Sequence, residues 1–173
     1  MTLEEWRARV AMSGEDWHAS IDPKRMIDWL SAQGYGPLHW DFATACCRRN
    51  WAELPDEALQ RVVEHFERVG MRGIDDLLQE ADQTLGKLAQ RLRNTTASDK
   101  EAAFDRRIGY GGIVVTAFGC QDGASAARVI SGGLLEWAPD AEVEARLQAD
   151  ALRRLVPEPS RRAASEEGEV AEP

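Results

Sequence analysis

The stretch IDDLLQEADQTLGKLAQRLR, residues 74–93, carries the clearest structural signal in the chain. Its apolar side chains recur at spacings of four, three, four, three and four residues, at Ile74, Leu78, Ala81, Leu85, Leu88 and Leu92. This is the a/d pattern of a helix that buries one seam against a neighbouring helix. We predict that the seam packs within the same chain, and a homodimer through residues 74–92 is the alternative.

Capping signals and apolar stripes predict further helices before this segment. Thr2 and Glu5 form a capping box at the start of the sequence. Asp22 is a favourable N-cap for a helix that opens with Pro23, since the first turn has no use for the N–H that proline lacks. The helix expected after Pro55 has an apolar stripe at Leu59, Val62, Val63, Phe66 and Val69.

The sequence after residue 93 is helical with one ambiguity, GYGGIVVTAFGC at 109–120. Its β-branched residues favour a strand, but no second strand is evident to pair with it, so we predict a buried helix over 113–118. Asp122 caps the next helix, whose small residues permit close packing. Asp140 caps the last one, for which we predict an inward stripe at Val143, Leu147, Ala151 and Leu155.

The length of 173 residues fits one domain with a core. We predict an all-α fold, a compact bundle of about six or seven helices over residues 1–156. The remainder, 157–173, has almost no large apolar residue and is rich in Pro, Glu, Ser and Ala. Such a composition predicts a disordered acidic tail, because it cannot bury enough apolar surface to fold.

The protein is predicted to be cytoplasmic and to have no membrane partner. No apolar run approaches the roughly 18 residues that a membrane span needs, and MTLEEWRARV lacks the apolar core of a signal peptide. Three cysteines, two of them adjacent, do not form a disulfide framework.

A second stretch, FATACCRRNW at 42–51, raises the question of a site. In a helix over 38–54, Ala43, Cys47, Trp51 and Leu54 share one face. Cys46 and Cys47 are candidates for a metal- or thiol-dependent enzyme or sensor. However, adjacent helical residues point about 100° apart, and no cysteine or histidine stands at metal-ligand spacing with another. Buried packing is the simpler interpretation, and we predict no cofactor.

Charge argues against nucleic-acid binding, which is the weaker alternative function. The formal net charge is −9, so the chain repels phosphate at long range. Three arginine pairs, at 48–49, 106–107 and 153–154, are the features that favour it. Ion pairing with nearby Asp and Glu on helix surfaces explains them equally well.

Several motifs together resemble the signature of a family of bacterial proteins found in planctomycete genomes. They are Trp17, DP at 22–23, MIDWL at 26–30, FATACCRRNW at 42–51, ELPDEALQRVVEHFERV at 53–69 and QADALRR at 148–154. The family typically has a Phe, alternating Ala and Cys, two cysteines, two arginines and a Trp at the position of 42–51. The chain departs from it at 36–41, where GPLHWD replaces a basic stretch.

The resemblance implies a helical fold and no particular activity. It also implies that Arg48, Arg49 and Trp51 belong to a signature within a helix. Such a signature fits a structural role, in which the Trp and Cys side chains point inward and the arginines pair with acidic residues of neighbouring helices. It fits a partner-binding face equally well.

We therefore predict a non-catalytic interaction protein or regulatory companion of another bacterial protein. The candidate interaction residues are Cys46, Cys47, Arg48, Arg49 and Trp51. No motif in the sequence brings together a nucleophile, a base and an orienting group.

Overall fold

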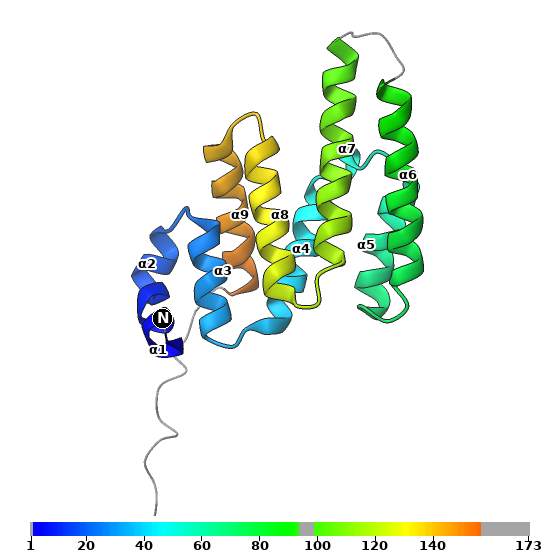
Figure 1. The fold of residues 1–173 in the computed structure, drawn as a ribbon. Coiled ribbons are helices and arrows are strands. Elements are labelled where there is room, and N and C mark those ends of the chain that lie inside the picture. Colours follow the sequence, from blue (N-terminus) through cyan, green and yellow to red (C-terminus); the bar gives the residue numbers. More distant parts are fainter. Residues whose placement is uncertain (1, 94–98, 157–173) are drawn as a thin grey trace, which may run out of the picture.

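Helices form every regular element of the computed structural model, which describes residues 2–93 and 99–156 (Figure 1). The fold class predicted from the sequence is thus confirmed. Within these residues the helices are α1 (Leu3–Val10), α2 (Gly14–Ala19), α3 (Pro23–Ala32), α4 (Gly36–Arg49), the 3-10 turn η1 (Trp51–Glu53), α5 (Glu57–Val69), α6 (Asp75–Arg93), α7 (Asp99–Phe118), α8 (Gly123–Trp137) and α9 (Ala141–Leu155).

The described residues hold nine α-helices, more than the six or seven expected. One reason is the short helix α2, which the sequence analysis did not predict. Ser13 and Asp16 form a capping box there, and this box satisfies the free N–H groups of a helix only six residues long. The predicted tail, 157–173, lies outside the described residues.

The seam of residues 74–92 packs within the chain, as predicted. Ile74, Ala81 and Leu85 are buried, and α6 lies against α5 and α7. Further along the helix, Leu88 and Leu92 are only half-buried. A homodimer through this helix would therefore need a surface other than the buried part of the seam.

The ambiguous segment at 109–118 is helical, because it forms the second half of α7. Its glycines let neighbouring helices approach closely. A Cβ at Gly111 would lie 2.6 Å from a methyl carbon of Leu85 and 2.9 Å from one of Leu59. Thus β-branched residues at 113–115 fit a helix here, since tertiary packing overrides their weak local preference for a strand.

Helix α4 is the centre of the fold and contacts α3, α5, α8 and α9. Figure 1 shows α5, α6 and α7 on one side of it and α1 to α3 on the other, with the α6–α7 hairpin extending beyond the rest.

Two aromatic clusters fill these sides. Trp40, Phe66 and Phe118 have ring centroids 4.6–6.1 Å apart, and Trp17 lies 5.1 Å from Trp29. Trp17 also donates from Nε1 to the Val156 carbonyl at 3.2 Å, which ties α2 to the end of α9.

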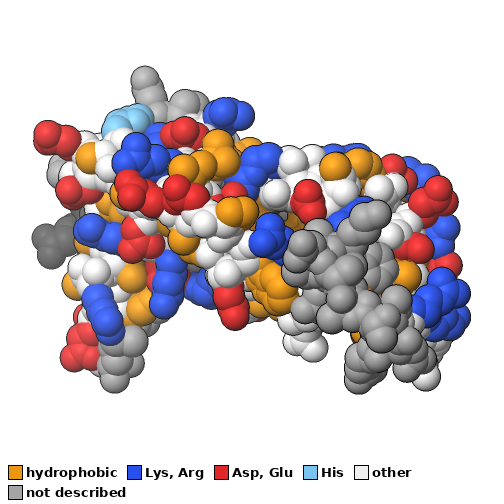
Figure 2. Space-filling view, turned by 90° about the horizontal axis from the view of Figure 1, so that it is seen from above, with side chains coloured by type: hydrophobic (Ala, Val, Ile, Leu, Met, Phe, Trp, Pro, Cys, Tyr) orange, Lys and Arg blue, Asp and Glu red, His pale blue; other side chains and the backbone are white. Residues whose placement is uncertain are grey.

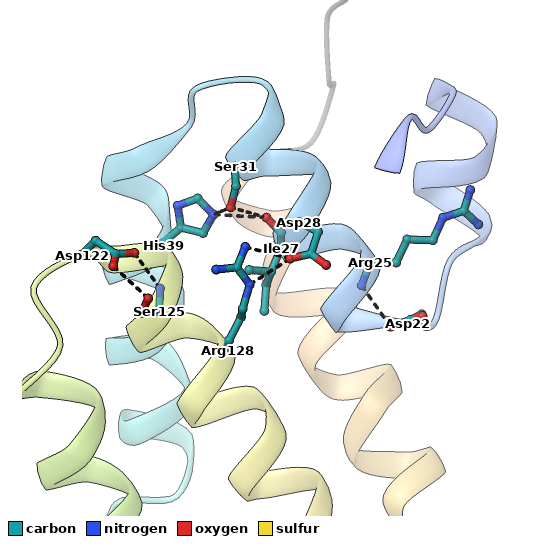
Figure 3. Close-up of polar contacts among 9 residues, drawn as sticks. All are labelled: Asp22, Arg25, Ile27, Asp28, Ser31, His39, Asp122, Ser125 and Arg128. Carbon is teal, nitrogen blue, oxygen red and sulfur yellow. Dashed lines mark hydrogen bonds and ion pairs between the residues drawn. The ribbon is translucent and has the colours of Figure 1, made fainter. Parts of the chain in front are cut away.

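Polar contacts join α3 to its neighbours (Figure 3). Arg128 of α8 donates from Nε to Asp28 at 2.8 Å. The buried His39 of α4 has its Nε2 3.0 Å from Ser31 Oγ and its Nδ1 3.1 Å from the Gly36 carbonyl. Both ring nitrogens therefore have partners, which makes the burial of this imidazole acceptable.

The inward stripe predicted for α9 is wrong in its first half, whereas Ala151 and Leu155 in its second half are half-buried and pack against the core. Val143 and Leu147 are 53% and 43% exposed, whereas Glu144 and Gln148, the next residue in each case, are buried. The helix is rotated so that a polar stripe faces the core, because those two side chains are hydrogen-bonded there. Hydrophobic spacing alone does not anticipate this arrangement.

No helix within residues 2–93 and 99–156 is sufficiently long and apolar to cross a membrane.

Two adjacent glycines of α8 provide a test of the packing between α7 and α8. A Cβ at Gly133 would lie 2.5–2.8 Å from three carbons of the Ile113 side chain, whereas a Cβ at Gly132 would meet nothing within 4 Å. We expect Gly133→Ala to destabilise the protein by about 1–2 kcal/mol through overpacking. Gly132→Ala should instead stabilise it by about 0.5–1 kcal/mol through helix propensity. Urea denaturation of both variants measures the difference, and equal midpoints would contradict the close approach.

Candidate functional site

The adjacent cysteines of α4 are buried and point towards different neighbours. Cys46 and Cys47 are 1% and 0% exposed. The charges of Arg49 and Glu144 act on Cys46, whereas the Tyr110 hydroxyl is the polar neighbour of Cys47. The two thiols thus diverge as their sequence positions predict.

The environment of the two thiols keeps them protonated at neutral pH. Burial raises the pKa of Cys46 far above its ordinary value and that of Cys47 to about 12. Since the thiolate is both the nucleophile and the metal ligand, these cysteines are poorly suited to either chemistry. In the described part of the chain, no group of three or more His, Cys, Asp or Glu side chains is placed to hold a metal ion.

Arg48 and Trp51 form a separate unit on the surface. The Arg48 guanidinium donates to both carboxylate oxygens of Glu67 on α5 and lies 4.0 Å from the centre of the Trp51 ring. Trp51 is half-buried and packs against the edge of the core, although it was expected on the same buried face as Cys47. The reason is that α4 ends at Arg49, and Trp51 opens the 3-10 turn η1, so the spacing of an α-helix no longer applies.

Arg49 reaches the buried polar stripe of α9. Its Nη2 pairs with Glu144 Oε1, and Gln148 Nε2 donates to the same oxygen at 2.7 Å. Ser131 Oγ of α8 donates to Gln148 Oε1 at 2.6 Å. The chain of contacts Arg49–Glu144–Gln148–Ser131 therefore connects α4, α9 and α8 through their interior, and we call it the interior polar chain.

The half-buried Ser31 and the buried His39 also form a pair, but the pair does not make a nucleophile. Ser31 Oγ donates to the Ile27 carbonyl of its own helix at 2.9 Å, and His39 is 1% exposed. The Nδ1 atom of His39 faces the Gly36 backbone carbonyl, where a catalytic triad has a carboxylate. The pair connects α3 to α4 and is closed to substrate.

A pocket of about 210 Å³ lies at one end of the interior polar chain, between η1, α7 and the α8–α9 turn. Its lining residues combine charged, polar and apolar side chains: Asn50, Glu53, Arg106, Tyr110, Leu134, Trp137, Ala138, Pro139 and Glu144. Tyr110 is 3% exposed, and its hydroxyl is buried beside the Cys47 thiol, which is at best a weak hydrogen-bonding partner. Burial raises the pKa of this hydroxyl, and the neighbouring Cys47 adds to the shift, so the group stays protonated.

Of the five residues predicted as an interaction site, the structure brings only part together. Cys46 and Cys47 are buried in the core, and Arg49 starts the interior polar chain. Arg48 and the half-buried Trp51 lie together on another side of α4, where Arg48 pairs with Glu67 of α5. Sequence reasoning missed Tyr110, Trp137 and Glu144. For Tyr110 and Trp137 the sequence carries no periodic signal, and Glu144 stood next to the residue that was expected to be buried.

A comparison of the chain with protein-family models, curated proteins and solved structures finds no match. The resemblance to the planctomycete family stays a prediction.

Thiol reactivity tests the burial of the cysteine pair. Cys120 is half-buried, and its thiol is the most accessible of the three. We expect a thiol reagent to modify Cys120 first in the native protein, while Cys46 and Cys47 react only after denaturation. Cys120→Ala provides the control and should remove the early reaction. Rapid labelling of Cys46 or Cys47 in that variant, located by peptide mass spectrometry, would show an activated thiol instead.

The contribution of the interior polar chain to the free energy of unfolding is measured by comparing variants of two glutamates. Glu144→Gln leaves Arg49 without its buried anion and should reduce the free energy of unfolding by about 1–3 kcal/mol. Glu67→Gln removes the ion pair of Arg48, whose partner carboxylate is 34% exposed. It should cost less than about 1 kcal/mol. Urea denaturation at neutral pH gives both values, and a larger loss for Glu67→Gln would contradict the structural role of the polar chain.

Proposed function

We propose that the protein is a non-catalytic interaction protein of the bacterial cytoplasm, which docks a helix of another protein on the outer face of α9. The rotation of α9 carries this proposal. The helix turns Glu144 and Gln148 inward and leaves Val143 and Leu147, one turn apart, open to solvent. A helix that keeps apolar residues outside while burying polar ones is typical of a surface that has a partner.

The partner is an amphipathic helix. Val143 and Leu147 form a short apolar ridge along α9, and Glu142, Arg146 and Asp150 flank it with alternating charge. Such a ridge matches apolar residues at i and i+4 of an opposing helix, with charges on both sides that fix its register.

A second copy of the chain is a weaker candidate for the partner. A stable homodimer buries about 20–30 residues on each side, far more than the exposed apolar residues of α9 provide. Mixed charges around the ridge suit a contact of moderate affinity between different chains.

Two other functions find less support. Thiol or metal chemistry at Cys46 and Cys47 has no open coordination or attack path, because both side chains are fully buried. For nucleic-acid binding, Arg48, Arg49 and Arg153 are engaged with carboxylates. Figure 2 shows acidic and basic side chains intermixed over the face in view.

Site-specific crosslinking tests the docking surface. We expect a photoreactive amino acid at Val143 to crosslink one protein in the native host, and the same group at Asp82, exposed on α6, to give no such product. The crosslinked protein is then purified and its affinity measured. Leu147→Lys should weaken binding at least about tenfold, since it places a charge in the apolar ridge.

Val69→Lys is the matched control, because Val69 is 48% exposed at the end of α5, similar to Leu147. It should leave the affinity unchanged. Equal crosslinking from Val143 and Asp82, no product from either, or equal affinity of the Leu147→Lys variant and the original protein would each count against the α9 surface.

A further inference from the structure

Helices α7 and α8 present an outer surface that is almost free of charge. Residues 108–137 include three charged side chains, Asp122, Arg128 and Glu136, although charged residues make up 29% of the chain. Asp122 is the N-cap of α8 and accepts hydrogen bonds from Ser125, which leaves two charged residues along the helix itself. In Figure 1, α8 lies between α9 and α7 and contacts α4 behind it, so the side of α8 that faces away from α4 is open.

Gly132 lies at the centre of this open side. It is exposed, and a Cβ at this position would meet nothing within 4 Å. Residues three and four positions away share one side of an α-helix. Gly132 is therefore surrounded by the half-buried Arg128, Val129 and Leu135 and the exposed Glu136. We call these five residues the Gly132 face.

No contact within the described residues explains a glycine at position 132. Glycine in the middle of a helix is unfavourable compared with alanine, and it commonly serves a close approach. Gly133 serves one, because its missing side chain makes room for Ile113, whose carbons would lie 2.5–2.8 Å from a Cβ. The corresponding side of Gly132 is open. A second helix that crosses at Gly132 would come very close, since no side chain separates the two backbones.

The charges of the Gly132 face are complementary to a second copy of the same face. Arg128 and Glu136 each stand four residues from Gly132, about 6 Å along the helix axis in opposite directions. If two α8 helices cross antiparallel at Gly132, Arg128 of each copy meets Glu136 of the other, and the two-fold symmetry makes this contact twice. A parallel crossing would bring like charges together.

Both charged side chains have bonding capacity for such a contact. Arg128 uses Nε and Nη2 for one oxygen of Asp28, and the remaining N–H groups of its guanidinium are left for another carboxylate. Glu136 forms no ion pair or hydrogen bond within the described part of the chain. The chain has a net charge of −9, so two copies repel each other least where a surface carries one charge of each sign.

We propose that a second copy of the chain docks on the Gly132 face, so that two α8 helices cross antiparallel at Gly132 in a symmetric dimer. Val129 and Leu135 supply the apolar contact, and the two Arg128–Glu136 pairs fix the direction. The face is smaller than the interface of a permanent dimer, so we expect a dissociation constant on the order of 10 µM. This inference is independent of the docking surface on α9, which includes no residue of α8.

Charge reversal tests the dimer and its direction together. We expect sedimentation equilibrium of the full chain to show a monomer–dimer equilibrium between micromolar and millimolar concentration. Arg128→Glu and Glu136→Arg each place like charges at both contacts and should weaken the dimer at least about tenfold. An equimolar mixture of the two variants joins opposite charges again. It should form a heterodimer with nearly the original affinity, which native mass spectrometry identifies by its mass.

Arg146→Glu and Asp82→Arg are the matched controls, because they reverse the same charges on α9 and α6. Arg146 is engaged with Glu142 as Arg128 is with Asp28, so both reversals also break one surface ion pair. Neither control should change the dissociation constant. Circular dichroism shows whether each variant is folded. Glu136→Arg removes no contact within the described residues, so it tests the face even where Arg128→Glu unfolds.

Gly132→Ala separates the dimer from the stability of the single chain. Its methyl group favours the helix but stands at the crossing point, so the variant should dimerise at least about threefold more weakly while its monomer is no less stable. A chain that stays monomeric up to millimolar concentration would overturn the proposal. So would a dimer that persists in both charge-reversal variants, or a mixture of the two that forms no heterodimer.

Discussion

The ion pair between Arg49 and Glu144 fixes how the last helix meets the rest of the fold. A carboxylate that is 7% exposed is costly to bury unless charge and hydrogen bonds compensate it. Arg49 supplies the charge, and Gln148 and Ser131 complete the hydrogen bonds. Once these side chains face α4 and α8, the rotation of α9 about its axis is determined. Val143 and Leu147 must then lie outside, and Glu144 must reach the pocket beside Tyr110. The outer face of α9 and the pocket are therefore two results of one buried contact.

Sequence periodicity was sufficient where apolar burial decides the structure and insufficient where polar burial does. The seam through Ile74, Ala81 and Leu85 was readable because its partners are apolar and close in sequence. The stripe of α9 was misread because spacing cannot distinguish an apolar face that is buried from one that lies beside a buried glutamate. Arg49 and Glu144 are 95 residues apart, and nothing local in either segment points to the other. The sequence does not predict the place of Tyr110 either, since Cys47 and Tyr110 lie on different helices and only the folded chain brings them together.

The pair at Cys46 and Cys47 illustrates how a conspicuous motif acquires a modest structural role. The two small, polarisable side chains lie on the central helix and pack against two different neighbours. Larger side chains would fit less easily into the space that each cysteine fills. The arginines that follow them divide in the same way. Arg48 turns outward to Glu67 and Trp51, and Arg49 turns inward to Glu144. Cys46 and Arg49 thus share the side of α4 that faces Glu144, whereas Cys47 and Arg48 face Tyr110 and Glu67. The chemistry differs between these sides, although the adjacent residues suggest a single site.

Helix α4 has its main partners, α8 and α9, near the other end of the chain, and Trp17 bonds to Val156 across 139 residues. On a ribosome, α4 is made long before these helices emerge. Part of its buried face, with Phe42, Ala43 and both cysteines, waits for these helices during that interval. Contacts of such high sequence separation close late and slow the folding of a helical protein. A nascent chain that stops short of Leu152 therefore exposes part of the core, and such chains are natural substrates for chaperones.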